Sequence, residues 1–251
     1  MRTEHTPHSF SNVKTVDMTK NLSISVAASL TLAATLATQN VSAEQLTTYE
    51  VTVTNATNNV TFTPIISITH TSAASLFEVG EPASVALEDL AEGGSPALLE
   101  AEFDAIRNTV VEIATAAGSP ADGPFTAAGQ TATFRIQAHP GADRLSMAAM
   151  LLPTNDSFMA LNGVPLPTRG SATFAAIGYD AGTELNNQLC SQIPGPQCDG
   201  TPDGQGTNPA RNDRGDFVHV SSGVHDVGDL RAYEYDWRNP VALVTVTRIG
   251  D

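Results

Sequence analysis

The feature that most limits the possible folds of this chain is a succession of short, β-branched segments separated by turn-forming residues. Tyr49–Thr54 alternates between polar and apolar side chains, and Val60–Ile68 resumes the extended pattern after an asparagine-rich turn. Alternation with a period of two is typical of strands that bury one face. We interpret the two segments as an opening hairpin, with Pro64 at a strand edge or bulge because proline donates no ladder hydrogen bond.

The rest of the pattern is mainly β with one helical interruption. Apolar residues between Pro82 and Ile106 fall close to helical spacing, and Gly93–Pro96 divides them, which predicts two short helices or helical turns. The other extended segments are residues 131–136, 145–152, 171–178 and 241–249. Recurrent short strands with Gly and Pro turns predict an antiparallel β-sandwich with a short helical insertion near the start.

Composition limits the number of domains and the class of partner. The 251 residues are 41% hydrophobic, which is enough for one large packed core. The formal charge is -15, and lysine occurs only at positions 14 and 20. Nucleic acid is excluded as a partner because phosphate binding depends on clustered Lys and Arg.

The N-terminal region has the organisation of an export signal. Lys20 precedes the apolar, small-residue run Leu22–Ala37, and Val41-Ser42-Ala43 matches the small-x-small pattern of a cleavage site. We predict a leader over residues 1–43, with Met18 as an alternative start, and a single mature domain over residues 44–251. The mature protein is then secreted or periplasmic/extracellular, with no transmembrane span. The alternative is an N-terminal helix that belongs to the fold.

The segment from Asn186 to Asp216 is rich in Gly, Pro, Asn and Asp, and it contains both cysteines of the chain, Cys190 and Cys198. Long irregular loops are usually functional or mobile. In an exported chain, two cysteines at this spacing predict one local disulfide that closes the loop. The competing interpretation, a pair of metal thiolates, has no His or further Cys nearby to complete a site.

Three carboxylates stand beside turns at the ends of expected strands. Asp156 follows Pro153-Thr154-Asn155, while Asp180 and Glu184 flank the turn Ala181-Gly182-Thr183. Hard cations such as calcium take oxygen ligands at flexible geometry, and loops at strand ends can bring such oxygens together. We therefore predict a calcium site formed by Asp156, Asp180 and Glu184. The alternative is that all three acids cap turns through their own backbone.

The same segments resemble a known family. The order LSMAAMLLPTNDSF, IGYDAGTE and VALVTVTRI is similar to the spondin domain of F-spondin, of mindin and of bacterial secreted proteins, from about Thr48 to Ile249. The resemblance implies a β-sandwich akin to calcium-dependent lipid-binding modules, and it aligns Asp156, Asp180 and Glu184 with the calcium-holding positions. Glu184 stands where the animal proteins carry Asp, and Ser157 where they carry Trp.

Other candidates for chemistry are weaker. His70, His139, His219 and His225 lack the close spacing of a zinc helix, so each is expected to be structural or exposed. Ser221-Ser222-Gly223 lies near His225, but no Gly-x-Ser-x-Gly elbow accompanies it.

An aromatic stripe near the C-terminus has two interpretations. Tyr233, Tyr235 and Trp237 alternate along the chain, which is typical of one packed face of a strand. The alternative is a recognition edge for a partner or glycan.

These observations favour an exported, calcium-binding spondin-domain protein without enzymatic activity. It would act in adhesion, matrix or cell-surface interaction, with an extracellular protein or glycan as its unidentified partner. The alternative is a secreted hydrolase that acts on polysaccharide or lipid and uses the acidic loops as its site.

Overall fold

The computed structural model describes residues 45–116, 123–198, 200 and 216–250. These residues belong to one compact unit, Ser42–Asp251. The predicted leader over residues 1–43 and its cleavage site lie outside the described residues, so both stay predictions.

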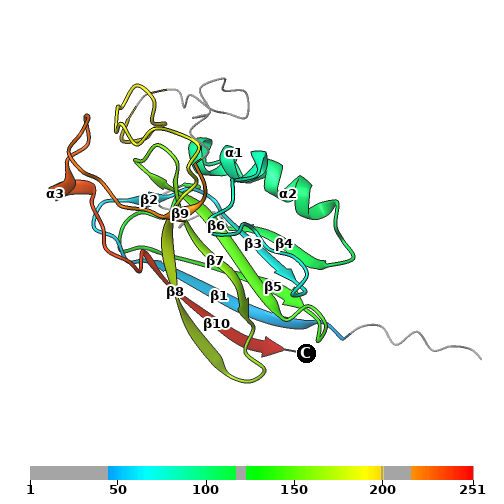
Figure 1. Cartoon of the computed structure of the whole chain (residues 1–251). Helices are drawn as coiled ribbons and strands as arrows, with labels where there is room; N and C mark the ends of the chain where they lie inside the picture. The colour runs from blue at the N-terminus through cyan, green and yellow to red at the C-terminus, as the bar shows by residue number, and fades with distance from the viewer. Residues whose placement is uncertain (1–44, 117–122, 199, 201–215, 251) are drawn as a thin grey trace, which may run out of the picture. The chain divides into compact units, whose positions relative to one another are not determined.

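Strands dominate the described part of the chain, and every strand pair in it is antiparallel (Figure 1). The strands are β1 (Thr47–Asn55), β2 (Thr61–Phe62), β3 (Ile65–His70), β4 (Val110–Ala116), β5 (Thr131–Ala138), β6 (Arg144–Leu152), β7 (Ser157–Pro165), β8 (Ser171–Asp180), β9 (His219–Val220) and β10 (Ala242–Gly250). The helices are α1 (Val85–Gly93), α2 (Ala97–Asp104) and α3 (Ala232–Tyr235).

The strands form one continuous sheet in the order β4-β3-β6-β7-β8-β10-β1-β5, with β2 added to β6 and β9 added to β8. The sheet is nearly closed, because its two end strands approach each other. Thr69 on β3 donates a hydrogen bond to the carbonyl of Gln137 on β5 (2.6 Å), and the N–H of Gln137 donates to the carboxylate of Glu112 on β4. The prediction of a mainly-β antiparallel fold is confirmed, and the two halves of the sheet face each other as the layers of a sandwich do.

The predicted opening hairpin is wrong. β1 pairs with β10 and β5, whereas β3 pairs with β4 and β6. The alternation in Tyr49–Thr54 specified which side chains are buried, but it carried no information about which strand lies alongside. Pro64 lies between β2 and β3, outside both strands, so its missing N–H removes no hydrogen bond from the sheet.

Two apolar clusters hold the domain together. The first fills the space between the two halves of the sheet, where Val51 of β1, Met147 of β6 and Val244 of β10 are fully buried. The second lies between the sheet and the helical insertion, and it includes Ile66 and Leu87. Helix α1 therefore covers the outer face of β6 and β7, and α2 lies against β4, on the same side of the sheet in Figure 1.

The predicted helical insertion is confirmed as α1 and α2, and capping residues fix both ends of α1. The side chain of Ser84 accepts a hydrogen bond from the N–H of Leu87 (3.2 Å), which caps the start of α1. Gly94 ends the helix in the left-handed region at φ 70°. A Cβ at Gly94 would come within 2.5 Å of Thr63, so this close packing of the helix end on the sheet requires glycine.

The aromatic residues near the C-terminus do not form one face of a strand. Ala232–Tyr235 is the short helix α3, in which residues two apart point in different directions. Tyr233 is accordingly 84% exposed, whereas Trp237, beyond the helix, is 8% exposed and packs in the core. The strand interpretation is therefore wrong because the local backbone is helical.

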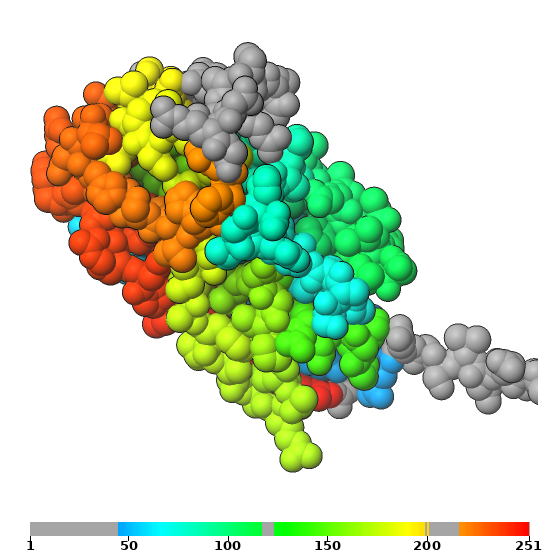
Figure 2. All heavy atoms as spheres, in the orientation of Figure 1, coloured from blue at the N-terminus to red at the C-terminus, as the bar shows by residue number. Residues whose placement is uncertain are grey.

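The segments that follow β8 gather at one end of the sheet. In Figures 1 and 2 the chain after Asp180, coloured yellow, lies beside residues 216–235, coloured orange. Hydrogen bonds join the two: the N–H of Asp229 donates to the carbonyl of Gln188 (2.8 Å), and the N–H of Cys190 donates to the carboxylate of Asp229 (2.9 Å). None of the helices in the described residues has the length and apolar character needed to cross a membrane.

Candidate metal centre

Asp156 lies in the turn that joins β6 to β7, and it is fully buried. Thr154 fixes the turn: its hydroxyl donates to the carbonyl of Leu151 (2.6 Å) and accepts from the N–H of Ser157 (3.1 Å). The carbonyl of Asp156 accepts a hydrogen bond from the N–H of Ala181 (3.1 Å). The turn is thereby tied to the end of β8.

Asp180 is the last residue of β8, and the sheet register pairs it with Ser157 of β7. Two strand ends that are neighbours in the sheet therefore bring Asp156 and Asp180 together. Oδ1 of Asp180 accepts from the N–H of Gly182 (2.9 Å), and Oδ2 accepts from the side-chain amide of Asn186 (2.7 Å). His219 of β9 is paired with Asp180 in the sheet register, and its Nδ1 lies 3.9 Å from Oδ1 of Asp180.

Gly182 turns the chain back over Asp156. It has φ 69°, and a Cβ there would lie 2.7 Å from the carbonyl oxygen of Phe217. The turn directs the N–H groups of Thr183 and Glu184 to Oδ2 of Asp156, at 2.8 and 3.0 Å. One oxygen of the Asp156 carboxylate is thus held by backbone donors that are 27 and 28 residues away in the sequence.

The two acids are costly to ionise together. Burial raises the pKa of Asp156 to about 8, the charge of Asp180 adds to the shift, and the N–H donors of Glu184 and Thr183 oppose it. Burial likewise raises the pKa of Asp180, against its hydrogen bonds to Asn186 and Gly182 and the charge of His219. A positive charge between the two carboxylates would relieve this repulsion.

The fit of a cation is supported by one orphaned atom. Oδ1 of Asp156 is buried and has no hydrogen-bond partner among the described residues. A buried carboxylate oxygen normally has a donor or a cation beside it. The acid pair and this oxygen therefore suit a hard cation, which prefers carboxylate, carbonyl and water oxygens.

The third predicted ligand is placed differently. Glu184 is buried, and its backbone N–H rather than its carboxylate is seen to hold Asp156. Within the described ranges, no three His, Cys, Asp or Glu side chains form a set arranged to hold an ion. A complete calcium shell would therefore need carbonyl and water oxygens beside the carboxylates.

The turn-cap alternative holds for Asp180 but not for Asp156. Asp180 accepts from the N–H two residues on, which is the local bond expected of an aspartate in a turn. Asp156 accepts only from distant residues, so a local cap does not account for its burial.

The sequence interpretation missed two further carboxylates that act on the acid pair. Glu92 of α1 adds to the negative charge that raises the pKa of Asp156, and Asp216 does the same for Asp180. Spacing alone gave no signal for Glu92, because the burial of Glu88 and Glu92, four residues apart on the helix, is seen only in the structure. Two acids on a buried helical face indicate a polar site beneath the helix.

The predicted disulfide is confirmed. Cys190 and Cys198 are bonded, with their Cα atoms 4.9 Å apart. The bridge closes the loop that follows the acid-rich turn and leaves that loop packed on residues 224–237. The thiolate-pair interpretation is wrong because both sulfur atoms are in the bridge.

The residues behind the hydrolase alternative do meet in space. Ser221, Ser222, His225 and Asp236 line a cavity of about 330 Å³. However, Ser221 bonds to the hydroxyl of Ser157 (2.9 Å), and Asp236 accepts from the N–H of Val224 (3.2 Å) and from Arg238. No hydrogen bond in the described part of the chain links the His225 ring to either serine or to Asp236, so no proton relay is formed there.

His70 has the structural role expected of an isolated histidine. It is buried, with Nδ1 2.7 Å from the carbonyl of Thr71 and Nε2 2.7 Å from the hydroxyl of Ser146. Burial lowers its pKa, so the ring is neutral at pH 7. The bond to the carbonyl places the proton on Nδ1 and leaves Nε2 to accept from Ser146.

Fold and site together define an antiparallel β module that buries an acid pair where its strands end. Comparison with protein families agrees: the Spondin_N family matches residues 46–192, and the chain belongs to this family. The match spans β1 to β8 with the acid pair, and β10 lies beyond it. No curated protein matches the chain.

Family membership suggests an extracellular module, and the spondin domain family is generally non-catalytic. The disulfide agrees with this location, because such bonds persist in oxidising compartments.

Proposed function

We propose that the protein is an extracellular calcium-binding module that acts in adhesion, matrix or cell-surface interaction rather than in catalysis. The observation that carries the proposal is the buried pair Asp156 and Asp180, with one carboxylate oxygen of Asp156 left without a hydrogen-bond donor. Two adjacent buried acids with raised pKa values favour either protons or a cation, and calcium is the abundant hard cation outside cells.

Asp156 and Asp180 would hold the ion, and Glu184 would join them by turning its carboxylate toward the pair. The bound ion would supply positive charge between the carboxylates. The chain's own contribution is orientation: the N–H groups of Thr183 and Glu184 fix Asp156, while Gly182 and Asn186 fix Asp180.

The site has a mechanical consequence for the loops around it. It ties the β6–β7 turn, the end of β8 and the segment after Asp180 to one another, and that segment is in turn bonded to residues 225–229. A cation would therefore stiffen the loops at one end of the sheet, where an extracellular protein or a glycan would bind.

The test is calorimetric titration of the purified protein with calcium, together with thermal melts in calcium and in chelator. Asp156→Asn removes one charge, while Asp143→Asn makes the same change at a side chain that is 60% exposed and serves as the matched control. We expect calcium to bind the parent and the control and to raise their melting temperatures by linkage, and to do neither for Asp156→Asn. Equal behaviour of the three proteins would contradict the proposal.

The hydrolase alternative keeps one supporting observation, the cavity that Ser221, Ser222, His225 and Asp236 share. A screen of polysaccharide and lipid substrates that found turnover, with loss on Asp180→Ala, would favour it over the calcium module. Turnover that survived Asp180→Ala but failed in Ser222→Ala would place the chemistry in that cavity instead.

A further inference from the structure

The cavity of about 330 Å³ that Ser222 and His225 share lies between the segment that follows β9 and the segment that joins α3 to β10. Every residue of its lining has a nitrogen or oxygen atom in the side chain: Ser221, Ser222, His225, Asp236, Trp237, Arg238 and Asn239. Small-molecule sites are usually lined mainly by apolar side chains. A lining of this kind favours a ligand that forms hydrogen bonds over much of its surface.

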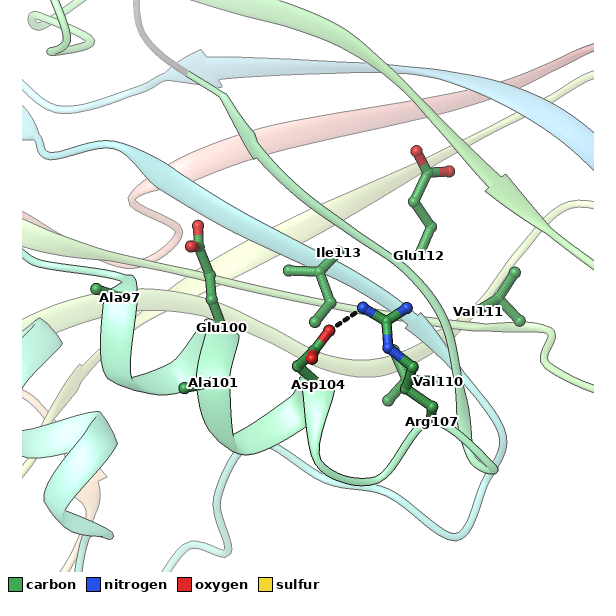
Figure 3. Close-up of a pocket in the computed structure, with 9 residues that line it drawn as sticks. All are labelled: Ala97, Glu100, Ala101, Asp104, Arg107, Val110, Val111, Glu112 and Ile113. Atoms are coloured by element: carbon green, nitrogen blue, oxygen red, sulfur yellow. Dashed lines mark hydrogen bonds and ion pairs between the residues drawn. The ribbon is translucent and has the colours of Figure 1, made fainter.

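A larger groove of about 570 Å³, between helix α2 and strand β4, differs in this respect (Figure 3). Arg107 pairs there with Asp104, as the dashed line in Figure 3 marks. The carboxylates of Glu100 and Glu112 accept hydrogen bonds from neighbouring segments of the chain. The charged side chains of this groove thus already have partners within the protein, and the groove indicates no particular ligand.

Trp237 brings a buried donor without a partner to the smaller cavity. The residue is 8% exposed and packs in the first apolar cluster. Its Nε1–H forms no hydrogen bond within the described residues, yet this atom keeps access to solvent. A Cβ at Gly178 of β8 would lie 2.9 Å from Nε1, so the glycine lets the indole edge lie against the strand. Because a buried indole N–H normally has an acceptor, a ligand in the cavity would supply the missing one.

Three further lining residues have polar groups that the protein does not use. The hydroxyl of Ser222 and the ring nitrogens of His225 form no hydrogen bond in the described part of the chain. Oδ1 of Asn239 accepts from the N–H of Gly178 (2.8 Å), which orients the amide and leaves its NH₂ group free. The indole and the amide offer donors, while the hydroxyl and the imidazole offer a donor and an acceptor each.

The wall of the cavity is held on the strands beside it. The N–H of Ser221 donates to the carbonyl of Gly178 on β8 (3.0 Å), and the hydroxyls of Ser221 and Ser157 on β7 are hydrogen-bonded to each other (2.9 Å). A site whose walls are already ordered loses less entropy when a ligand binds. The free polar groups are therefore displayed by a preformed cavity.

The charges of the lining are balanced within the protein. Arg238 is ion-paired with Asp236, and Asp236 also accepts from the N–H of Val224 (3.2 Å). The chain has a formal charge of -15, which opposes the approach of an acidic ligand. A neutral ligand rich in hydroxyl and carbonyl oxygens fits this set of groups best.

We propose that this cavity binds a neutral saccharide, as the terminal unit of an extracellular glycan, without cleaving it. Oxygens of the sugar would accept from Trp237 and Asn239, and its hydroxyls would exchange hydrogen bonds with Ser222 and His225. The volume is at the lower end of the roughly 300–1,000 Å³ of small-molecule sites, which suits the end of a glycan rather than its length. The inference rests on the proposed function only for the class of partner, and no lining residue belongs to the acid pair.

Trp237 is the only tryptophan of the chain, so its indole N–H gives a single NMR signal that reports on the cavity. The probes are the methyl glycosides of glucose, galactose, mannose and N-acetylglucosamine, with the methyl glycoside of glucuronic acid as the acidic comparison. Each is titrated into the isotope-labelled protein, once in chelator and once in saturating calcium.

Two variants test the cavity. Ser222→Tyr fills it from an exposed position that has no hydrogen bond to lose, and the new side chain adds no second indole. Asn239→Asp keeps the oxygen that accepts from Gly178 and removes the amide donor. Ser72→Tyr is the matched control, because Ser72 is also exposed and lines a different cavity with His70.

We expect at least one neutral glycoside to shift the indole signal saturably in the parent and in Ser72→Tyr. It should bind Ser222→Tyr and Asn239→Asp about tenfold or more weakly, a loss of about 1.4 kcal/mol. The absence of a saturable shift with all neutral glycosides would overturn the proposal, as would equal affinities of Ser222→Tyr and the parent. Tighter binding of the glucuronic acid glycoside would overturn the neutral class, and release of methanol would favour the hydrolase alternative instead.

The outcome is separable from that of the calcium proposal. A protein that binds calcium in calorimetry but none of the glycosides contradicts the saccharide site alone. A protein that binds a glycoside in chelator but does not bind calcium contradicts the cation site alone.

Discussion

Replacing Asp156 with asparagine should stabilise the calcium-free protein at alkaline pH. The pKa of this carboxyl rises from 3.8 to about 8 in the folded state. Between these values the folded protein holds a proton that the unfolded chain has released, so the free energy of unfolding falls as the pH rises from about 4 to 8. The shift corresponds to a cost on the order of 5 kcal/mol when the group is forced to ionise.

The asparagine keeps most of the hydrogen bonds and removes the charge. Its Oδ1 accepts from the N–H groups of Thr183 and Glu184 as Oδ2 of Asp156 does, but its amide nitrogen takes the place of the oxygen without a donor. Burying that amide costs about 1–3 kcal/mol if nothing accepts from it. We therefore expect Asp156→Asn to gain about 2–4 kcal/mol over the parent at pH 8 in chelator, and to gain nothing near pH 4.

Urea denaturation at pH 4.5 and pH 8, each with chelator and with saturating calcium, measures all four free energies. Calcium should reverse the order at pH 8, because the ion stabilises the parent by RT ln(1 + [L]/Kd) and the variant not at all. A variant less stable than the parent at pH 8 in chelator would refute the electrostatic reasoning. A parent whose stability did not fall between the two pH values in chelator would refute it as well.

Three further changes test other contacts. Gly182→Ala should destabilise the protein by about 1–3 kcal/mol and weaken calcium binding, because the added Cβ would clash with the Phe217 backbone. Gly170→Ala is the control: Gly170 also has a positive φ but has open space around it, so this change should cost about 1 kcal/mol or less in urea denaturation. Cys198→Ser should be about 2–3 kcal/mol less stable than the disulfide-bonded parent, and the reduced parent should have the same stability as the variant. His70→Gln should flatten the loss of stability between pH 6.5 and 5 in saturating calcium. Burial lowers the pKa of His70, so on acidification the unfolded chain takes up a proton at this ring that the folded state does not. An unchanged slope would assign that loss to other groups.

Local pattern predicted the elements better than their neighbours. Strands β1, β5, β6, β8 and β10 and helices α1 and α2 fall where alternation or helical spacing indicated them. β4 and β7 were not identified, because Val110–Ala116 and Ser157–Pro165 mix small and polar residues without a regular period. The predicted extended segment Val60–Ile68 contains β2 and overlaps β3, whereas the two-residue strand β9 was not identified.

The candidate site was predicted in part for the same reason. Asp156 and Asp180 were expected at strand ends, and both lie there. The contribution of Glu92 from α1 and the backbone donors on Asp156 depend on how distant segments pack, which spacing along the chain does not encode. The role of Glu184 as a ligand stays a prediction.

The mainly-β class, the helical insertion, the disulfide and the acids beside the turns could all be predicted from the sequence, because each depends on residues close together in the chain. Tertiary structure was needed to show that β1 pairs with β10 and β5, that Asp156 and Asp180 share one buried environment, and that the end strands β4 and β5 approach each other. These properties arise from contacts between segments as much as two hundred residues apart. The free energy of such contacts depends on how well the packed side chains fit together and how deeply they are buried, and the local sequence pattern predicts neither.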